Sequence, residues 1–279
     1  MTDRISFQGE PGANSDIACR QAYPALSPLP CPTFEDAFAA VSDGGAKYAM
    51  IPIENSVAGR VADVHHLIPE SNLYVVGERF LPVRHQLIGL QGASLAGLKQ
   101  VRSHPQALGQ CRKLLREMKL EAVKTADTAG AAREIAELGD PSVGALASSL
   151  AAELHGLQIL KADIADAAHN TTRFLVFSKE PDDAEPEDGP CMTSFVFRVR
   201  NLPAALYKAL GGFATNGVNM TKLESYLEDG QFSAAMFYAD IEGHPSQPSV
   251  KLALEELQFF SSYLKVLGVY LADEFRRMA

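Results

Sequence analysis

The sequence predicts an α/β protein in which a smaller βαββαβ unit follows an alternating strand and helix region. From residue 3 to about 178, short apolar runs alternate with helical patterns, which is typical of an α/β region with a largely parallel sheet. From residue 191 onward the patterns read strand, helix, strand, strand, helix, strand, the split ferredoxin-like order. An acidic, proline-containing segment separates the two regions and marks a domain boundary.

The first region begins with strand and helix patterns in regular alternation. Strands are expected at the apolar runs ISF, YAMIPI, NLYVVG and QLIGL, because runs of this length with β-branched residues suit buried strands. Leu108, Cys111, Leu115 and Met118 fall on one face of a helical pattern, so that face should pack on the sheet. Helices are therefore expected over 14–22, 60–68 and 104–118.

Residues 179–190 read KEPDDAEPEDGP, with three prolines and six acidic residues in twelve positions. Such a composition does not form a core element. We expect a linker here.

The second region begins with the strand TSFVFRV and the helix LPAALYKALGGFA, in which Leu206, Leu210 and Phe213 share one face. The strands NMTKLESYL and QFSAAMFYADI follow, and Asp229-Gly230 between them is a hairpin signal. A helix over 249–261 and the strand YLKVLGVY complete the unit. Because such a unit leaves strand edges and a sheet face open, we expect it to pair with a second copy of the chain.

Composition excludes several classes of protein. The formal net charge is -9 over 279 residues without a basic cluster, which argues against nucleic acid and anionic membrane as partners. The four cysteines are scattered along the chain, so no disulfides are expected. His65 and His66 are adjacent, and two adjacent histidines cannot both face one ion from a regular helix, so no metal site is expected either. No signal peptide or run of eighteen apolar residues is found. We expect a soluble, cytoplasmic protein.

Polar residues follow four strand or helix boundaries of the first region, where ligands bind in open α/β sheets. Each also has a structural interpretation. Ser15 in GEPGANS could belong to a plain turn and helix cap, and Glu54, Asn55 and Ser56 to an Asx-type turn. Ser103 could be a simple helix cap, because Ser103 and His104 precede Pro105, which suits the first position of a helix. Asp127 in ADTAGAA is typical of an N-cap.

A fifth stretch, NTTRFLVF at residues 170–177, joins polar residues to a strand. Phe174, Leu175, Val176 and Phe177 have the character of a buried strand, yet two hydroxyls and a guanidinium stand at its entrance. The pattern of a buried strand does not by itself explain these polar groups.

Together these motifs resemble those of the prephenate dehydratases, in the same order and spacing. They are GEPGANS, PIENS, SHPQALGQC, DTAGAA, GALASSLAAELHGLQIL and NTTRF. The second region, with LPAALYKAL and NMTKLES, resembles the ACT regulatory domain of that family. The resemblance covers nearly the whole chain, and no helical segment precedes the first strand, as in the monofunctional form without chorismate mutase.

The resemblance implies a two-lobed catalytic domain over 1–180, similar to a periplasmic binding protein. One lobe would comprise about 1–80 with 165–180 and the other about 81–164. The active site would lie between the lobes, with NTTRF on the crossing strand near the hinge. The ACT domain would span 191–279.

The implied reaction removes carbon dioxide and hydroxide from prephenate and yields phenylpyruvate without a cofactor. Thr172 would hydrogen-bond to the leaving hydroxyl, Arg173 would bind a carboxylate, and Asp127 or His104 could relay a proton. Consecutive side chains of a regular strand point to opposite faces, so Thr172 and Arg173 can reach one ligand only if the strand begins after them, at Phe174. The substrate-binding residues that the resemblance implies are Ser15, Asn55, Ser56, Ser103, His104, Gln110 and Phe174.

The resemblance also implies inhibition by phenylalanine bound between paired ACT domains. Two positions depart from the family pattern. Ala204 stands where the family has glycine, and we expect the start of a helix to tolerate this methyl group. The sequence ESYL replaces the usual ESRP. Two alternatives remain: arogenate dehydratase, which acts on the amino form of the substrate, and a non-catalytic amino-acid-sensing protein. The implied phenylalanine-binding residues are Asn201, Leu202, Ala204, Ala205, Leu206, Glu224 and Ser225.

Overall fold

The computed structural model describes residues 2–167, 169–200, 202–227 and 234–278. Strands form three sheets in this part of the chain. The turn expected at Asp229-Gly230 lies outside the described residues.

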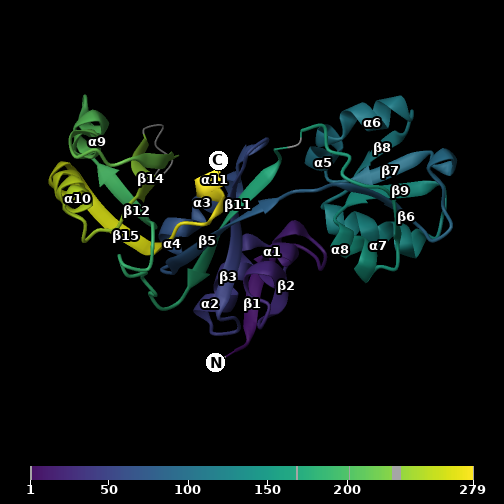
Figure 1. Ribbon diagram of the computed structural model, residues 1–279, viewed down its shortest axis with the longest axis horizontal. Helices are drawn as coiled ribbons and strands as arrows, with labels where there is room; N and C mark the ends of the chain where they lie inside the picture. The colour runs from purple at the N-terminus through teal and green to yellow at the C-terminus, as the bar shows by residue number, and fades with distance from the viewer. Residues whose placement is uncertain (1, 168, 201, 228–233, 279) are drawn as a thin grey trace. The chain divides into compact units, whose positions relative to one another are not determined.

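The first sheet has the strand order β2-β1-β3-β11-β5, and β4 pairs with β3. β1 is parallel to both β2 and β3, and helices α1 and α2 connect these strands (Figure 1). The strands expected at ISF, YAMIPI and NLYVVG and the helix over 14–22 are confirmed. The bounds are β1 (Arg4–Gln8), α1 (Asn14–Ala22), β2 (Ser27–Cys31), α2 (Phe34–Ser42), β3 (Tyr48–Asn55), β4 (Gly59–Arg60), β5 (Tyr74–Pro82) and β11 (Thr171–Ser178).

The second sheet has the order β10-β6-β9-β7-β8. It is mixed rather than largely parallel, because β6 is antiparallel to β9 and β10 while β7 is parallel to β8 and β9. Its elements are β6 (Gln86–Gly89), η1 (Leu95–Gly97), β7 (Gln100–Ser103), α5 (Pro105–Gln110), α6 (Arg112–Glu117), β8 (Glu121–Lys124), α7 (Thr128–Leu138), β9 (Val143–Ala147), α8 (Ser149–Leu154) and β10 (Gln158–Lys161).

Helices cover both faces of the second sheet. Figure 1 shows α5 and α6 on one side of it and α7 and α8 on the other. Leu87 and Val101 pack in the same buried cluster as Leu108 and Leu115 of α5 and α6. A separate cluster joins Ile88 to the small residues of α7 and α8.

Two helices expected from the sequence are each divided in the structure. The helix expected over 60–68 is α3 (Ala62–His65) followed by α4 (Leu67–Glu70). The helix expected over 104–118 is α5 and α6, because Cys111 leaves the helical conformation at φ -121° and ψ 24°. The expected apolar face is confirmed, since Leu108, Cys111 and Leu115 are buried in one cluster and Met118 packs against it.

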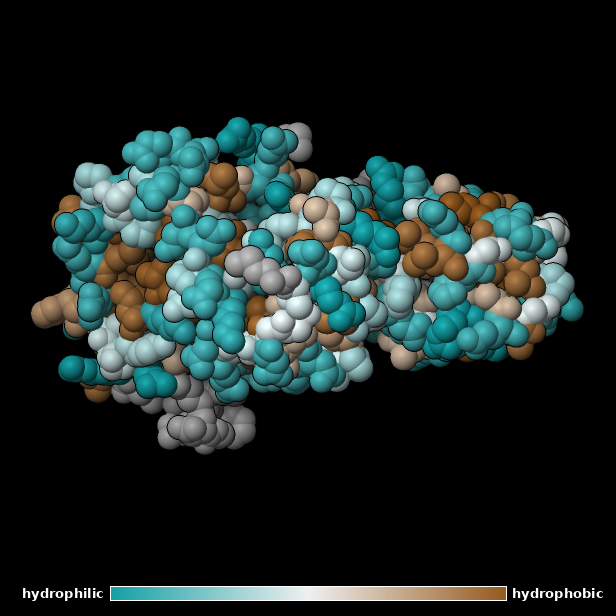
Figure 2. Space-filling model, turned by 90° about the horizontal axis from the view of Figure 1, so that it is seen from below, coloured by the Kyte–Doolittle hydropathy of each residue, from teal (hydrophilic) through white to brown (hydrophobic). Residues whose placement is uncertain are grey.

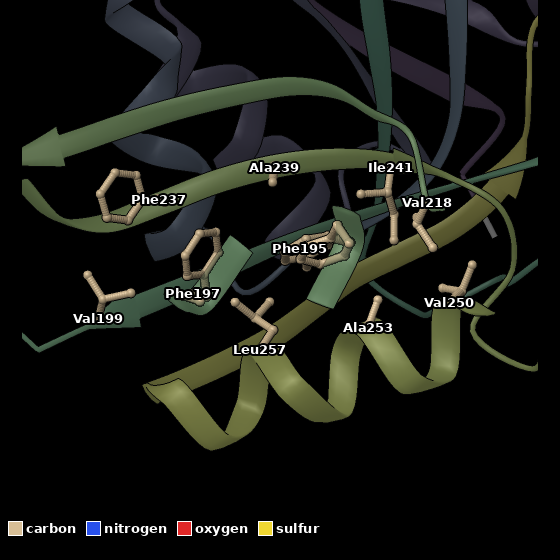
Figure 3. Packing of buried hydrophobic residues seen from close by; sticks show 12 residues of the cluster. Phe195, Phe197, Val199, Val218, Phe237, Ala239, Ile241, Val250, Ala253 and Leu257 are labelled. Carbon is tan, nitrogen blue, oxygen red and sulfur yellow. The ribbon is translucent and has the colours of Figure 1, made fainter. Parts of the chain in front are cut away.

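The third sheet confirms the βαββαβ order, with neighbouring strands β13-β14-β12-β15 all antiparallel. Figure 3 shows Val250, Ala253 and Leu257 of α10 pointing toward Phe195 and Phe197 of the sheet. The bounds are β12 (Cys191–Val199), α9 (Ala205–Thr215), β13 (Met220–Leu227), β14 (Ala234–Glu242), α10 (Pro248–Phe260), β15 (Ser261–Leu271) and α11 (Phe275–Met278).

The chain packs as two compact units whose boundary differs from the one we expected. One unit comprises Met1–Val61 with Phe80–Phe174, and the other Ala62–Arg79 with Leu175–Ala279. Residues 62–79 thus pack with the C-terminal region, although β5, which contains Tyr74–Arg79, is also a strand of the first sheet. The segment 179–190 has no helix or strand, as expected of a linker, but it is bound to β15: Ala184 N donates to Val269 O at 2.9 Å.

Two contacts explain why residues 62–79 pack with the C-terminal region. The Glu78 carboxylate is 2% exposed and accepts from Nε and Nη2 of Arg276 at 2.6 and 2.9 Å. A Cβ atom at Gly268 of β15 would overlap the carbonyl oxygen of Val75 in β5. Glycine therefore lets the two backbones approach each other here.

Among the described residues, no helix has both the length and the apolar character needed to cross a membrane.

Candidate active site

The end of β3 and the start of β11 are joined by the side chain and backbone of Ser56. Its Oγ donates to His169 O at 2.6 Å and accepts from Thr171 N at 2.9 Å, while Ser56 N donates to Thr171 O at 2.9 Å. These bonds fix the backbone just before the TTRF sequence. Ser56 thereby sets where β11 begins.

Asn55 forms an Asx-type turn and also contacts the NTTRF stretch. Its Oδ1 accepts from Val57 N and Ala58 N at 3.0 and 2.9 Å, which confirms the turn expected from the sequence. Its Nδ2 donates to Asn170 Oδ1 at 2.7 Å and to Thr172 Oγ1 at 3.0 Å. The structure therefore brings Asn55 and Thr172, both predicted site residues, into direct contact.

Asn170 extends this contact to Gln110 and His85. Asn170, only 3% exposed, donates from Nδ2 to Gln110 Oε1 at 3.0 Å. His85 Nε2 lies 2.7 Å from the same oxygen. Burial lowers the pKa of the His85 imidazole, and its hydrogen bond with Gln110 opposes that shift.

Neither Asn170 nor His85 was among the predicted site residues. Asn170 stands first in NTTRF and could have been included on that ground. His85 is a single histidine before an apolar strand, and nothing in the local pattern distinguishes it. It reaches the site because it directly precedes β6 and its Nε2 lies 2.7 Å from Gln110, the last residue of α5.

Thr172 and Arg173 lie on opposite faces of β11. The strand begins at Thr171, not at Phe174, so the condition under which both side chains reach one ligand is not met. Arg173 is 1% exposed, and its Nη1 lies 3.2 Å from Glu54 Oε1. The carboxylate that this guanidinium binds belongs to the protein. Phe174, at 1% exposed, lies in the core.

Of the two residues before α5, His104 and not Ser103 caps the helix. Ser103 does not cap the helix: it is fully buried, and its Oγ donates to Leu146 O at 2.7 Å. His104 is the N-cap, because its Nδ1 accepts from Gln106 N at 3.3 Å. Pro105 occupies the first turn, as expected.

Asp127 and Ser15 stand at the starts of two other helices. Asp127 is the N-cap of α7, where its Oδ1 accepts from Gly130 N at 2.7 Å, so its expected capping role is confirmed. Ser15 lies in the first turn of α1 and is 9% exposed. The N-cap of α1 is Ala13, which shows that Ser15 is not a cap.

The GEPGANS turn packs against α7 and α8. Ser148 Oγ donates to Gly12 O at 2.5 Å, and Gly12 has φ +90°. Glu10 accepts from Arg133 of α7 at 3.0 Å through each carboxylate oxygen. The hydrogen bond from Arg133 lowers the pKa of the Glu10 carboxyl. The turn that carries Ser15 is thus fixed to the helices of the second sheet.

The residues expected to bind phenylalanine lie around the start of α9 and on β13. Asn201 lies outside the described residues, and Leu202 is 62% exposed. Ala204 has φ +62° and ψ +12°, so the expectation that this helix start tolerates a methyl group without strain was wrong: the left-handed region favours glycine. Glu224 and Ser225 are consecutive on β13 and therefore point to opposite sheet faces.

Comparisons with known proteins give the family. A family model described as prephenate dehydratase matches residues 5–182. The bifunctional N-acyl-homoserine lactone acylase/prephenate dehydratase of Komagataeibacter europaeus is 52% identical, over 98% of this chain and 97% of that protein. Arogenate dehydratase/prephenate dehydratase 1 of Arabidopsis thaliana, a chloroplastic protein, is 39% identical, over 97% of this chain and 72% of that one.

A solved structure is similar over both units. Prephenate dehydratase from Arthrobacter aurescens, in complex with L-Phe, has a TM-score of 0.88 and 29% identity, covering 96% of this chain and 90% of that one. Members of the family are lyases that act by dehydration and decarboxylation. With the motif residues gathered around Asn55 and Thr172, and with this coverage, the chain belongs to the prephenate dehydratase family.

Proposed function

We propose that this chain converts prephenate to phenylpyruvate, with loss of water and carbon dioxide, in the biosynthesis of phenylalanine. The observation that carries the proposal is the hydrogen bond from Asn55 Nδ2 to Thr172 Oγ1 at 3.0 Å. Because the Thr172 oxygen accepts this bond, its own hydrogen is directed elsewhere and can serve a leaving hydroxyl.

In the proposed reaction, the ring C–O bond and the bond to the ring carboxylate both break. The electron pair of the carboxylate bond enters the ring, which becomes aromatic, while carbon dioxide and hydroxide depart. Aromatisation supplies the driving force, so the protein mainly orients the substrate and assists the leaving group. Thr172 does the latter by hydrogen bonding, and no cofactor is needed.

The remaining site residues divide into those that touch the substrate and those that hold them. We assign substrate contacts to Ser15, His104 and the amide nitrogen of Gln110, and a supporting role to Ser56 and the fully buried Ser103. Arg173 supports through Glu54 rather than binding a substrate carboxylate. Asp127 supports by capping α7, and a relay through it or His104 is not needed for the assignment.

The direct test is to incubate the purified chain with prephenate and follow phenylpyruvate by its absorbance at alkaline pH. The same assay with arogenate, read as phenylalanine release, decides between the two dehydratase activities, because several relatives carry arogenate dehydratase in their names. Turnover of neither compound would leave the amino-acid-sensing alternative and refute the proposal.

We further propose that phenylalanine inhibits the enzyme by binding the ferredoxin-like unit, which we assign as an ACT domain. In support, the Arthrobacter aurescens relative was solved with L-Phe, and a ligand carboxylate suits the positive end of the helix dipole at the start of α9. Glu224, 20% exposed in its side chain, is the expected partner of the ammonium group. Calorimetry on wild type and Glu224→Gln tests this, and no heat with wild type up to millimolar phenylalanine would exclude it.

Pairing of two chains through this unit is part of the same proposal. Large hydrophobic side chains of α10 and β15 are exposed, among them Leu252, Phe259 and Tyr263 at 50, 82 and 39%. Figure 2 shows hydrophobic surface interspersed with hydrophilic residues on one face of the molecule. A sedimentation experiment that shows a stable monomer at micromolar protein concentration would refute this pairing. A cytoplasmic location stays a prediction.

A second candidate activity is the hydrolysis of N-acyl-homoserine lactones. The observation that favours it is the 52% identity, over almost the full length of both chains, to a relative named as a bifunctional acylase and dehydratase. The test is to incubate the chain with an acyl-homoserine lactone and measure release of the fatty acid. Release that persists in Thr172→Val would show that the two activities use different groups.

A further inference from the structure

We propose that His85 is a positioning residue of the dehydratase site and that it acts through a one-way hydrogen-bond chain of side-chain amides. The amide chain comprises Asn55, Asn170, Gln110 and His85, with Thr172 as a branch at Asn55. The proposal rests on the dehydratase function proposed above. It identifies the hydrogen bonds that determine which atom of each side chain in that site is the donor.

The direction of the amide chain starts at the backbone. Asn55 Oδ1 faces two amide hydrogens, those of Val57 and Ala58, at 3.0 and 2.9 Å. A side-chain amide whose oxygen faces two donors must present its nitrogen on the other side. Asn55 therefore donates, to Asn170 Oδ1 at 2.7 Å and Thr172 Oγ1 at 3.0 Å, with a longer contact of 3.3 Å to Thr171 O.

The same reasoning determines which atoms donate at Asn170, Gln110 and His85. Because Asn170 accepts through Oδ1, its Nδ2 is the donor to Gln110 Oε1 at 3.0 Å. The Gln110 oxygen is then an acceptor for both of its neighbours, since an amide oxygen carries no hydrogen. His85 Nε2, 2.7 Å from that oxygen, must carry the hydrogen. The chain thereby selects the Nε2–H form of the neutral imidazole.

This arrangement leaves two donors available to a substrate, the Gln110 side-chain nitrogen and the Thr172 hydroxyl. The Gln110 carbonyl is held by His85 and Asn170 from two directions, so its amide nitrogen points away from both and presents N–H groups to a substrate carboxylate. At the other end, Thr172 receives a hydrogen and has its own to give. His85 thus fixes the binding end of the site, and Asn55 fixes the end where the leaving group departs.

The two ends predict different kinetic effects. His85→Leu removes one donor to Gln110, so the Gln110 amide can rotate; we expect KM to rise about tenfold with kcat nearly unchanged, the loss expected for one hydrogen bond that acts equally on bound substrate and transition state. His85→Gln restores a donor at the Nε2 position and should bring KM back to within about threefold of wild type. Asn55→Asp cannot donate to Thr172, so kcat should fall.

Controls separate this proposal from a loss of folding and from a wrong function. His244→Leu, a change at a half-buried histidine of the ferredoxin-like unit that bonds Ser246, should leave both constants unchanged. Circular dichroism should give all variants similar melting temperatures. Nitrogen-15 NMR of the histidine rings should show His85 protonated at Nε2 in wild type, whether or not the chain turns over prephenate.

The outcomes are therefore distinguishable. An inactive wild type with His85 protonated at Nε2 would refute the proposed function and retain the amide chain. His85 protonated at Nδ1, or equal KM values for His85→Leu and wild type in an active enzyme, would overturn the inference. A His85→Gln variant as impaired as His85→Leu would also overturn it, because the donor would then not be what matters.

Discussion

Replacement of Gly12 by alanine tests whether the GEPGANS turn is locked against α8. Gly12 has φ +90°, and a Cβ atom there would lie 2.7 Å from Ala151 Cα and 2.9 Å from Ala151 Cβ. Ala151 Cα belongs to the backbone of α8 and Ala151 Cβ is attached directly to it, so neither atom can move aside as the end of a flexible side chain could. Gly44 is the matched control: it has φ +77° and nothing within 4 Å of its ideal Cβ.

The two variants share the backbone term and differ in the steric term. A non-glycine residue held at positive φ costs on the order of 1 to 3 kcal/mol, and this applies to both. Overpacking against a well-ordered neighbour adds about 1 to 3 kcal/mol, and this applies to Gly12 alone. For a chain of this size, 1 kcal/mol corresponds to roughly 2 to 4 °C in melting temperature.

Thermal unfolding followed by circular dichroism measures the difference. We expect Gly12→Ala to melt roughly 2 to 12 °C below Gly44→Ala, the product of the steric term and the conversion above. Equal melting temperatures would refute the reasoning, because they would mean that the turn moves away from α8 without loss.

Further predictions concern both units. Thr172→Val should lower turnover of prephenate by on the order of 10² or more with an unchanged melting temperature; a normal rate would exclude Thr172 from the chemistry. Ala204→Gly should stabilise the chain by roughly 1 kcal/mol in urea unfolding, since it removes a methyl group at φ +62°; destabilisation would contradict this. Glu78→Gln should destabilise the chain by about 1 to 3 kcal/mol, because it leaves the half-buried Arg276 without its carboxylate; a change within error would show that the pair is dispensable. Arg133 lowers the pKa of Glu10, so Glu10 stabilises the fold above its unfolded pKa and this contribution is lost as pH falls through the folded value; the melting difference between wild type and Glu10→Gln should be present at pH 7 and shrink steadily as the pH falls below the ordinary range of a glutamate, and a constant difference would contradict the assignment.

The fold was largely predictable because its strands and helices are marked by local patterns. Apolar runs predicted the strands at ISF and YAMIPI, and a shared helical face predicted the burial of Leu108 and Leu115. The division at Cys111 was not predictable, since the apolar period continues across it. The packing of residues 62–79 with the C-terminal region depends on the pair of Glu78 and Arg276, which no local pattern reveals.

The candidate site was predicted in part, for a similar reason. Motif order identified Asn55 and Thr172, and the structure brings them together at 3.0 Å. Sequence alone did not decide which residue caps α5, because Ser103 and His104 both suit the position; burial of Ser103 gave that role to His104. His85 was missed because its importance comes from Gln110, a residue 25 positions away along the chain.

The contact of Gly268 with Val75, together with the pair of Glu78 and Arg276, bears on how such a chain can evolve. Transfer of the ferredoxin-like unit to another protein would require a cut in the chain. A cut within 179–190 would here separate β15 and α11 from residues 62–79, exposing the backbone against which Gly268 fits and leaving the buried carboxylate of Glu78 without its counterion. We therefore expect the ferredoxin-like unit and residues 62–79 to have been inherited together, and a transplanted module to need both pieces from one parent.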